Sequence, residues 1–154
     1  MTTTAEKRVL IIDDDEPIRK LLAVVLRRRG ISSDCAVDGM EGWEKLERCS
    51  YALVLLDLMM PRMSGYEVLE KLSAVPPESR PHVVVLTAGA RPTLRADLVL
   101  TLIRKPFDVD IVAEVVIAGL DASRPSLQPH DCPDADSDRM FPQIGGPAST
   151  DPTN

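Results

Sequence analysis

A run of consecutive apolar residues that ends on a single carboxylate constrains the fold of this chain more than any other feature. The residues from Tyr51 to Leu56 are all apolar, and Asp57 follows them directly. A run that is apolar at every position is typical of a strand covered on both faces, as in a parallel α/β sheet. Such sheets bind ligands at the carboxyl ends of their strands. Asp57 is therefore predicted to lie where such a fold does its chemistry.

Segments with the pattern of strands alternate along the chain with segments that have the apolar spacing of amphipathic helices. Arg8 to Ile12 is a short, β-branched-rich run, and His82 to Thr87 is another apolar run that ends on a polar residue. Ile31 to Val37 is mixed in polarity, which favours a place near the sheet edge. We expect strands at 8–12, 31–37, 51–57, 82–87 and 98–103, and helices at 17–29, 40–47, 65–75 and 109–120.

The helical spacing also predicts which side chains face the sheet. In the first helix these are Ile18, Leu21, Leu22, Val25 and Leu26, and in the last they are Ile111, Val112, Val115 and Val116. Asp108 is a good N-cap for the last helix. The segment between Thr87 and Lys105 is less regular, because Gly89 and Pro92 interrupt it. Only 93–97 is expected to form a short helical turn there, so the fourth helix should be short or irregular.

Repeated β-α units with right-handed crossovers give an α/β fold with a doubly wound, five-stranded parallel sheet. The flavodoxin-like strand order 2-1-3-4-5 is one of the two common solutions. In that order the first and third strands are neighbours, which brings Asp13, Asp14 and Asp57 to one end of the sheet. Thr87 ends the fourth strand and Lys105 follows the fifth, so both reach the same edge. Five polar residues from distant parts of the chain are therefore predicted to converge.

At 154 residues the chain is sized for one domain, which we place at 8–123 between an N-terminal extension (1–7) and a tail (124–154). The tail is rich in proline and aspartate, so we expect it to be disordered. The net charge of −6 argues against direct binding of nucleic acid, which needs a basic face. We find no signal region and no run of about 18 apolar residues, so we expect no membrane insertion and a cytoplasmic location.

The acidic residues predicted at the sheet edge suit a magnesium ion. Carboxylates within a few ångström repel one another, and a hard divalent cation relieves that repulsion. Mg²⁺ prefers oxygen ligands and is usually held by one or two carboxylates together with phosphate oxygens. Asp14 and Asp57 are candidates for direct ligands, with the backbone carbonyl of Met59 as a third. Asp13 would act through a bound water.

Beside such a cation, Asp57 can act as a nucleophile toward phosphorus, since carboxylates form aspartyl phosphates. Lys105 carries a compact cation on a long stem, which suits a phosphoryl oxygen. Thr87 can donate its hydroxyl to another phosphoryl oxygen, and the small Ala88 beside it leaves room for the group. The sequence thus predicts a site for phosphoryl transfer.

Each of these residues also has a purely structural explanation. The acidic run can cap the helix that begins at Pro17, and we assign Asp15 and Glu16 mainly to that role. Lys105 can be an ordinary exposed lysine. Thr87 can be a β-branched strand residue that happens to be polar.

Four stretches that carry the five polar residues form a specific set: Asp13-Asp14, Asp57 followed by Met60-Pro61 and Met63-Ser64-Gly65, Thr87-Ala88, and Lys105-Pro106-Phe107. This set resembles the receiver domain of bacterial two-component response regulators. The match to the family runs from about Lys7 to Leu120. The resemblance implies that Asp57 is the phosphoacceptor and that Asp13 and Asp14 build the Mg²⁺ site. It implies that Thr87 is the switch hydroxyl and that Lys105 contacts the phosphoryl group. The donor would be a phosphohistidine on a sensor histidine kinase or a phosphotransfer protein.

Two departures from that family pattern lie between Thr87 and Lys105. The segment between Thr87 and Lys105 is a few residues shorter than in most receivers, and the usual Gly-Ala before the fifth strand is missing. The family often has an aromatic residue three positions before the lysine, where this chain has Leu102. Both changes fall on a face that many receivers use for output, so the usual coupling there is not expected.

The five sites and the resemblance together predict a stand-alone, phosphorylation-controlled signalling switch rather than a turnover enzyme. Its downstream protein partner is not indicated by the sequence. One alternative is a phosphorylation-independent, receiver-like adaptor, which the shortened segment favours. A weaker alternative is an Asp-nucleophile phosphatase. Such enzymes commonly need a second acid two residues after the nucleophile, where this chain has Met59.

Overall fold

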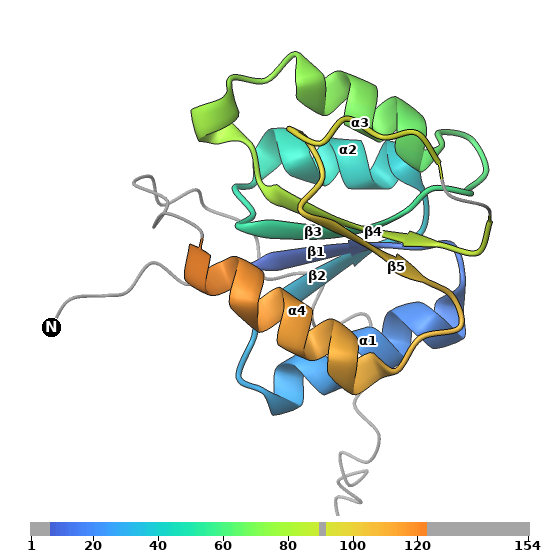
Figure 1. Ribbon diagram of the computed structural model, residues 1–154, viewed down its shortest axis with the longest axis vertical. Coiled ribbons are helices and arrows are strands. Elements are labelled where there is room, and N and C mark those ends of the chain that lie inside the picture. Colours follow the sequence, from blue (N-terminus) through green and yellow to red (C-terminus); the bar gives the residue numbers. More distant parts are fainter. Residues whose placement is uncertain (1–6, 90–91, 123–154) are drawn as a thin grey trace, which may run out of the picture.

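The computed structural model describes residues 7–89 and 92–122, and these form a five-stranded parallel sheet between two layers of helices (Figure 1). The strand order is β2-β1-β3-β4-β5, which confirms the predicted doubly wound topology. The expected N-terminal extension and the tail from residue 124 lie outside the described residues, except for Lys7.

The strands pair in a register that aligns the ends of their apolar runs. They are β1 (Val9–Ile12), β2 (Ser33–Ala36), β3 (Leu53–Asp57), β4 (His82–Thr87) and β5 (Thr101–Arg104). Ile12 on β1 pairs with Leu56 on β3, and Asp57 pairs with Leu86 on β4. The residue after β1 and the last residue of β3 therefore lie at the same edge of the sheet. The mixed-polarity strand β2 lies at an outer edge, as its composition predicts.

Side-chain caps fix where the helices α1 (Glu16–Arg28), α2 (Gly39–Arg48), α3 (Gly65–Ser73) and α4 (Val109–Ala122) begin. Asp15 accepts a hydrogen bond from the Ile18 N–H at 3.1 Å, which confirms its predicted capping role. Asp108 accepts one from the Asp110 N–H at 2.8 Å, as expected for the cap of the last helix. No helix within residues 7–89 and 92–122 is long and apolar enough to cross a membrane.

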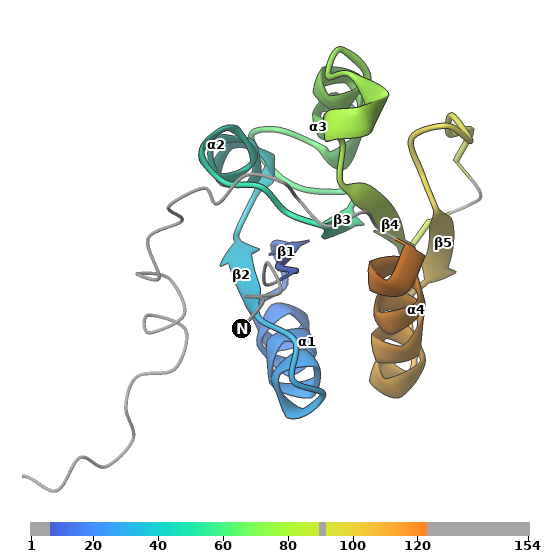
Figure 2. The same cartoon turned by 90° about the vertical axis from the view of Figure 1, so that its left-hand side faces the viewer.

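Alternate residues of the central strands face two separate cores. Helices α1 and α4 cover one face of the sheet, and α2 and α3 cover the other (Figures 1 and 2). On β1, Val9 and Ile11 pack toward α1 and α4, while Leu10 and Ile12 pack toward α2 and α3. Each central strand is thus covered on both sides, which is why its sequence is apolar at consecutive positions.

Two side chains that we expected to face the sheet do not. Leu21 on α1 is 49% exposed, and Ile111 on α4 is 55% exposed. Both flank the buried stripe of their helix, whose centre is formed by Leu22 and Leu26 on α1 and by Val112 and Val116 on α4. On both helices the apolar stripe of the sequence is therefore wider than the face that packs on the sheet.

The connection from β4 to β5 is irregular, as the prediction of a short or irregular fourth helix allows. Within the described residues 92–100 the only regular feature is a turn in which the Leu98 N–H donates to the Arg95 carbonyl at 3.1 Å. A five-residue segment cannot offset the cost of nucleating a helix. Leu94, Leu98 and Val99 instead pack on the same core as α2 and α3. An irregular apolar segment with one turn, close to the expected 93–97, thus covers this part of the core.

The start of α3 packs directly on the end of β3, and only glycine fits there. A Cβ on Gly65 would lie 2.3 Å from the Asp57 carbonyl oxygen and 2.7 Å from the Leu58 Cα. We predict that Gly65→Ala destabilises the protein by about 2 kcal/mol, because the backbone must shift to relieve the clash. That cost exceeds the gain in helix propensity, which is at most about 1 kcal/mol.

Urea denaturation of both proteins measures this difference. Gly89→Ala is the matched control, since its Cβ would meet nothing closer than 3.9 Å. We expect the control to change the free energy of unfolding by less than about 0.5 kcal/mol. Equal stability of Gly65→Ala and the wild type would contradict the packing argument.

Candidate functional site

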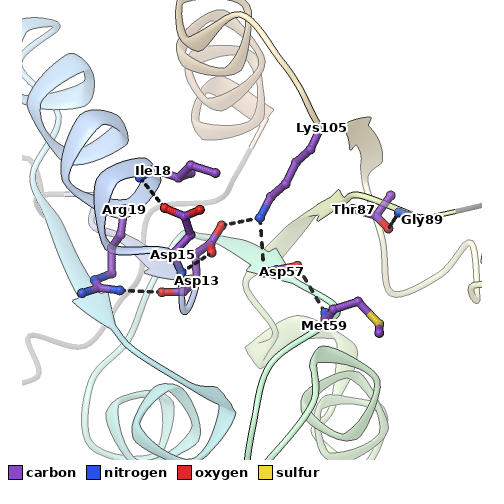
Figure 3. Close-up of polar contacts among 9 residues, drawn as sticks. All are labelled: Asp13, Asp15, Ile18, Arg19, Asp57, Met59, Thr87, Gly89 and Lys105. Carbon is purple, nitrogen blue, oxygen red and sulfur yellow. Dashed lines mark hydrogen bonds and ion pairs between the residues drawn. The ribbon is translucent and has the colours of Figure 1, made fainter.

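The carboxylates of Asp13 and Asp57 meet the ammonium group of Lys105 at the carboxyl edge of the sheet (Figure 3). Lys105 Nζ donates to Asp13 Oδ2 at 3.0 Å and to Asp57 Oδ2 at 3.3 Å. The two acids end neighbouring strands, and the lysine follows β5 on the far side of β4. The structure therefore brings together three of the predicted site residues through direct contacts.

The backbone after β5 places Lys105 at this edge. Its N–H donates to the Thr87 carbonyl at 2.7 Å, which continues the pairing of β4 with β5 by one residue. The peptide bond between Lys105 and Pro106 is cis. The side chain then reaches across the end of β4 to the acids on β1 and β3.

Asp13 is fully buried and held at three points besides Lys105. Its N–H donates to the Ala36 carbonyl at 3.2 Å, and its Oδ1 accepts from the Asp15 N–H at 2.9 Å. Its own carbonyl accepts from Arg19 Nη1 at 2.7 Å. One carboxylate oxygen is thus bound to the start of α1, and the other faces Asp57 and Lys105.

Asp14 lies beside the buried pair with its side chain exposed. Each of Asp13, Asp14 and Asp57 offers one carboxylate oxygen, and these three oxygens lie within 4.8 Å of one another. This group of oxygen ligands fits a hard divalent cation. A cation already interacts with two of the three acids, namely the ammonium group of Lys105.

The environment of Asp57 disfavours its charge. The residue is only 4% exposed, and burial together with the nearby charge of Asp13 raises its pKa to about 6. The Met59 N–H, which donates to Asp57 Oδ1 at 3.2 Å, and Lys105 oppose the shift but do not cancel it. A carboxylate in such a site gains from any added cation.

The charge of Lys105 is favoured overall. Burial lowers the pKa of the ammonium group, but the hydrogen bond and charge of Asp13, together with the charge of Asp57, outweigh that effect and raise the pKa. Lys105 is therefore a firmly charged group within the site and not the ordinary exposed lysine of the structural alternative.

Thr87 and Met59 are near the acids but make different contacts from those of Lys105. The Thr87 side chain is buried at the end of β4, and its Oγ1 accepts from the Gly89 N–H at 3.2 Å (Figure 3). Its hydroxyl is thus turned toward its own loop. Met59 has a 67% exposed side chain and contacts Asp57 through its N–H. The role of the Met59 carbonyl as a metal ligand remains a prediction.

Two contributions to the site were missed from the sequence. Arg19 binds the Asp13 carbonyl, and its only signal was its spacing, which places it on the same helical face as Leu22 and Leu26. Arg62, in the loop after the phosphoacceptor candidate, has a φ of 66° and donates from Nε to Asp38 Oδ2 at 2.6 Å. That ion pair joins the loop after β3 to the N-terminus of α2, and no local pattern indicates it.

Comparison with known proteins agrees with this geometry. The sequence matches the response regulator receiver domain over residues 9–116. The chain therefore belongs to the family of response regulator receiver domains, as its motifs suggest.

Curated relatives share part of their length with this chain. It is 41% identical over 73 residues to the response regulator mcs4 of Schizosaccharomyces pombe, covering 44% of this chain and 14% of mcs4. It is 36% identical over 89 residues to the transcriptional regulatory protein SrrA of Staphylococcus aureus, covering 58% of this chain and 36% of SrrA. The chain thus spans well under two thirds of either relative.

Solved structures with the same fold include two that are covered almost completely. A CheY-like receiver domain protein from Methanospirillum hungatei has a TM-score of 0.67 at 29% identity, covering 75% of this chain and 94% of that protein. The response regulator TrrA of Thermotoga maritima, solved in complex with Mg²⁺ and BeF, has a TM-score of 0.66 at 32% identity. The match covers 73% of this chain and 98% of the TrrA chain.

The raised pKa of Asp57 predicts that Asp57→Asn stabilises the metal-free protein. Between the ordinary value of 3.8 and about 6, the native state binds more protons than the unfolded state, so wild-type stability falls as the pH rises. Above pH 6 the charged carboxylate costs its full penalty. We expect the variant to be more stable by about 1–2 kcal/mol at pH 7.5. The gain should vanish near pH 4.

Urea denaturation in the presence of a chelator, repeated across this pH range, measures the difference. Asp110→Asn is the control, because the Asp110 side chain is exposed. It should show no such pH-dependent gain. A variant at Asp57 that is no more stable than the wild type at pH 7.5 would show that the carboxylate is not under electrostatic stress.

Proposed function

We propose that this protein is a phosphorylation-controlled signalling switch whose phosphoacceptor is Asp57. The observation that carries the proposal is the contact of one ammonium group, that of Lys105, with both Asp13 and Asp57. This arrangement holds a nucleophilic carboxylate beside a fixed positive charge at the open edge of the sheet. Membership of the receiver family supports the same role.

In the proposed reaction, one oxygen of the Asp57 carboxylate attacks the phosphorus of a phosphohistidine. The O–P bond forms as the P–N bond breaks, and the released imidazole takes up a proton. Lys105 is placed to turn from the Asp57 carboxylate to an oxygen of the arriving phosphoryl group. Its positive charge then offsets charge on the transferring group, as expected where positioning and electrostatics supply most of the catalysis.

Asp14 and Asp57 would bind Mg²⁺ directly, with the Met59 carbonyl as a third ligand and Asp13 acting through a water. The three carboxylate oxygens within 4.8 Å of one another support this assignment. Bound there, Mg²⁺ would shield the negative charges that otherwise repel an incoming phosphate. The TrrA structure was solved with Mg²⁺ and BeF, which supports magnesium as the cation in this family.

Thr87 is our candidate for the residue that reports phosphorylation. Its hydroxyl now accepts from the Gly89 N–H at the start of the irregular connection to β5. Donation to a phosphoryl oxygen requires the side chain to turn toward Asp57, which releases that N–H. Phosphorylation would thereby shift the population of conformations of the connection, to the extent that they differ in their contacts with the phosphoryl group.

The partners that we propose are a sensor histidine kinase or a phosphotransfer protein as donor, and a downstream protein as receiver of the signal, all in the cytoplasm. We propose no direct contact with nucleic acid and no turnover of external substrates. A phosphatase is disfavoured, since Met59 stands where such an enzyme commonly has its second acid.

The irregular β4–β5 connection favours one competing function, that of a phosphorylation-independent adaptor. Leu94, Leu98 and Val99 replace a helix on this face, so its surface differs from the one that a helix would present. Partner binding measured with and without a phosphodonor separates the two functions. A switch binds its partner more tightly in one state, whereas an adaptor binds equally in both.

We predict that a small phosphodonor such as acetyl phosphate labels the wild-type protein in the presence of Mg²⁺, and that Asp57→Ala abolishes the labelling. Intact-protein mass spectrometry detects the added phosphoryl group. Asp110→Asn is the control because its carboxylate is exposed and pairs with Arg29, and it should be labelled normally. Equal labelling of Asp57→Ala and the wild type would rule out Asp57 as the acceptor.

We predict that Thr87→Ala is labelled but no longer couples the label to the β4–β5 connection. In the wild type, phosphorylation should change the chemical shift of the Gly89 amide, because the Thr87 hydroxyl leaves it. In Thr87→Ala that amide has already lost its acceptor, so it should respond little. Thr87→Ser keeps the hydroxyl and should behave as the wild type does. The same shift change in all three proteins would exclude Thr87 as the switch.

A further inference from the structure

Arg19 is a buried cation on the inner face of α1. Its side chain is only 8% exposed and shares that face with Leu22 and Leu26. Among residues 7–89 and 92–122, no carboxylate forms an ion pair with it. A buried guanidinium group without an acidic partner is costly, so the one hydrogen bond that it makes with the site is informative.

That hydrogen bond goes to the peptide unit that precedes Asp14. Arg19 Nη1 donates to the Asp13 carbonyl at 2.7 Å (Figure 3). The carbonyl group and the N–H of Asp14 belong to one planar peptide unit, so holding the oxygen also fixes the direction in which Asp14 leaves it. A hydrogen bond to a charged donor is stronger than a neutral one, which suits a fixed anchor.

The peptide unit that follows Asp14 is anchored as well. Its N–H, which is that of Asp15, donates to Asp13 Oδ1 at 2.9 Å. Both peptide units that flank Asp14 are therefore tied to buried groups, although the Asp14 side chain itself is exposed. The backbone of Asp14 is thereby fixed, which limits the directions in which its exposed carboxylate can point.

We propose that Arg19 is a positioning residue for the magnesium site. By clamping the peptide unit between Asp13 and Asp14, it directs the Asp14 carboxylate toward Asp57. The inference rests on the proposed function, since it takes these carboxylates to be the ligands of the cation. Arg19 itself contacts neither the metal nor the phosphoryl group.

The charge of Arg19 and its positioning role have effects of opposite sign on metal binding. A guanidinium group near the carboxylates repels an added cation, so removing the charge alone would tighten Mg²⁺ binding. Removing the clamp frees the Asp13–Asp14 peptide, and ordering Asp14 then costs conformational entropy that the wild type has already lost. Whether replacing Arg19 weakens or tightens Mg²⁺ binding therefore shows whether positioning or charge dominates.

The experiment is a calorimetric titration of the metal-free, full-length protein with Mg²⁺ alone. For Arg19→Met, which keeps the apolar stem, we expect the Kd to rise about 10-fold or more, as for other groups that orient metal ligands. Arg19→Lys keeps a positive charge and one donor on a shorter stem, so it should weaken binding less. Arg28→Met removes an exposed arginine from the same helix and should leave the Kd unchanged.

Amide hydrogen exchange gives a second readout that does not involve the metal. The Asp15 N–H should exchange faster in Arg19→Met than in the wild type, because the clamp that holds its acceptor residue is gone. If Arg19→Met does not fold, Arg19→Lys carries both measurements.

The outcomes separate this inference from the proposed function. If the wild type binds no Mg²⁺, the proposed function fails and the inference fails with it. If the wild type binds Mg²⁺ and Arg19→Met binds it as tightly or more tightly, only the positioning role is overturned. Unchanged exchange of the Asp15 N–H in a folded variant would overturn it as well.

Discussion

The mutual repulsion of carboxylates at one edge of the sheet is the constraint on which the rest of the site depends. Asp13 and Asp57 are both buried there, and the ammonium group of Lys105 lies between them. It does not remove the strain, because the pKa of Asp57 is still raised to about 6. The site is therefore expected to bind a further positive charge favourably, and a divalent cation can supply it. The oxygens of an arriving phosphoryl group would then interact with the same cation.

The parallel sheet brings the acids together and also constrains their positions. The register of β1 with β3 sets the separation of Asp13 and Asp57, and the tight packing of Gly65 on the Asp57 carbonyl fixes the end of β3. By contrast, the connection from β4 to β5 is held by apolar packing, one turn and the ion pair between Arg80 and Asp97. The acids thus lie on the regular part of the sheet, and Thr87, the residue that we expect to move, lies where β4 meets the irregular connection.

The sequence was sufficient for the sheet order and for the convergence of the acids and Lys105, because each lies where a continuous apolar strand ends. It failed where the answer depends on three-dimensional packing. Leu21 and Ile111 fit the helical stripe but lie beyond the width that the sheet covers. The contact between Arg19 and the Asp13 carbonyl had no signal beyond the spacing of Arg19 on its helix. Such contacts join residues whose orientations depend on the folded backbone.

The decisive experiment for phosphorylation at Asp57 is a crystal structure of the protein with Mg²⁺ and beryllofluoride, which is a mimic of the phosphoryl group. We expect the mimic on an Asp57 carboxylate oxygen, with Lys105 Nζ and Thr87 Oγ1 within hydrogen-bonding distance of its fluorides. We expect the metal between Asp14 and Asp57. A mimic bound elsewhere, or a complex in which Lys105 stays turned away from it, would contradict the account.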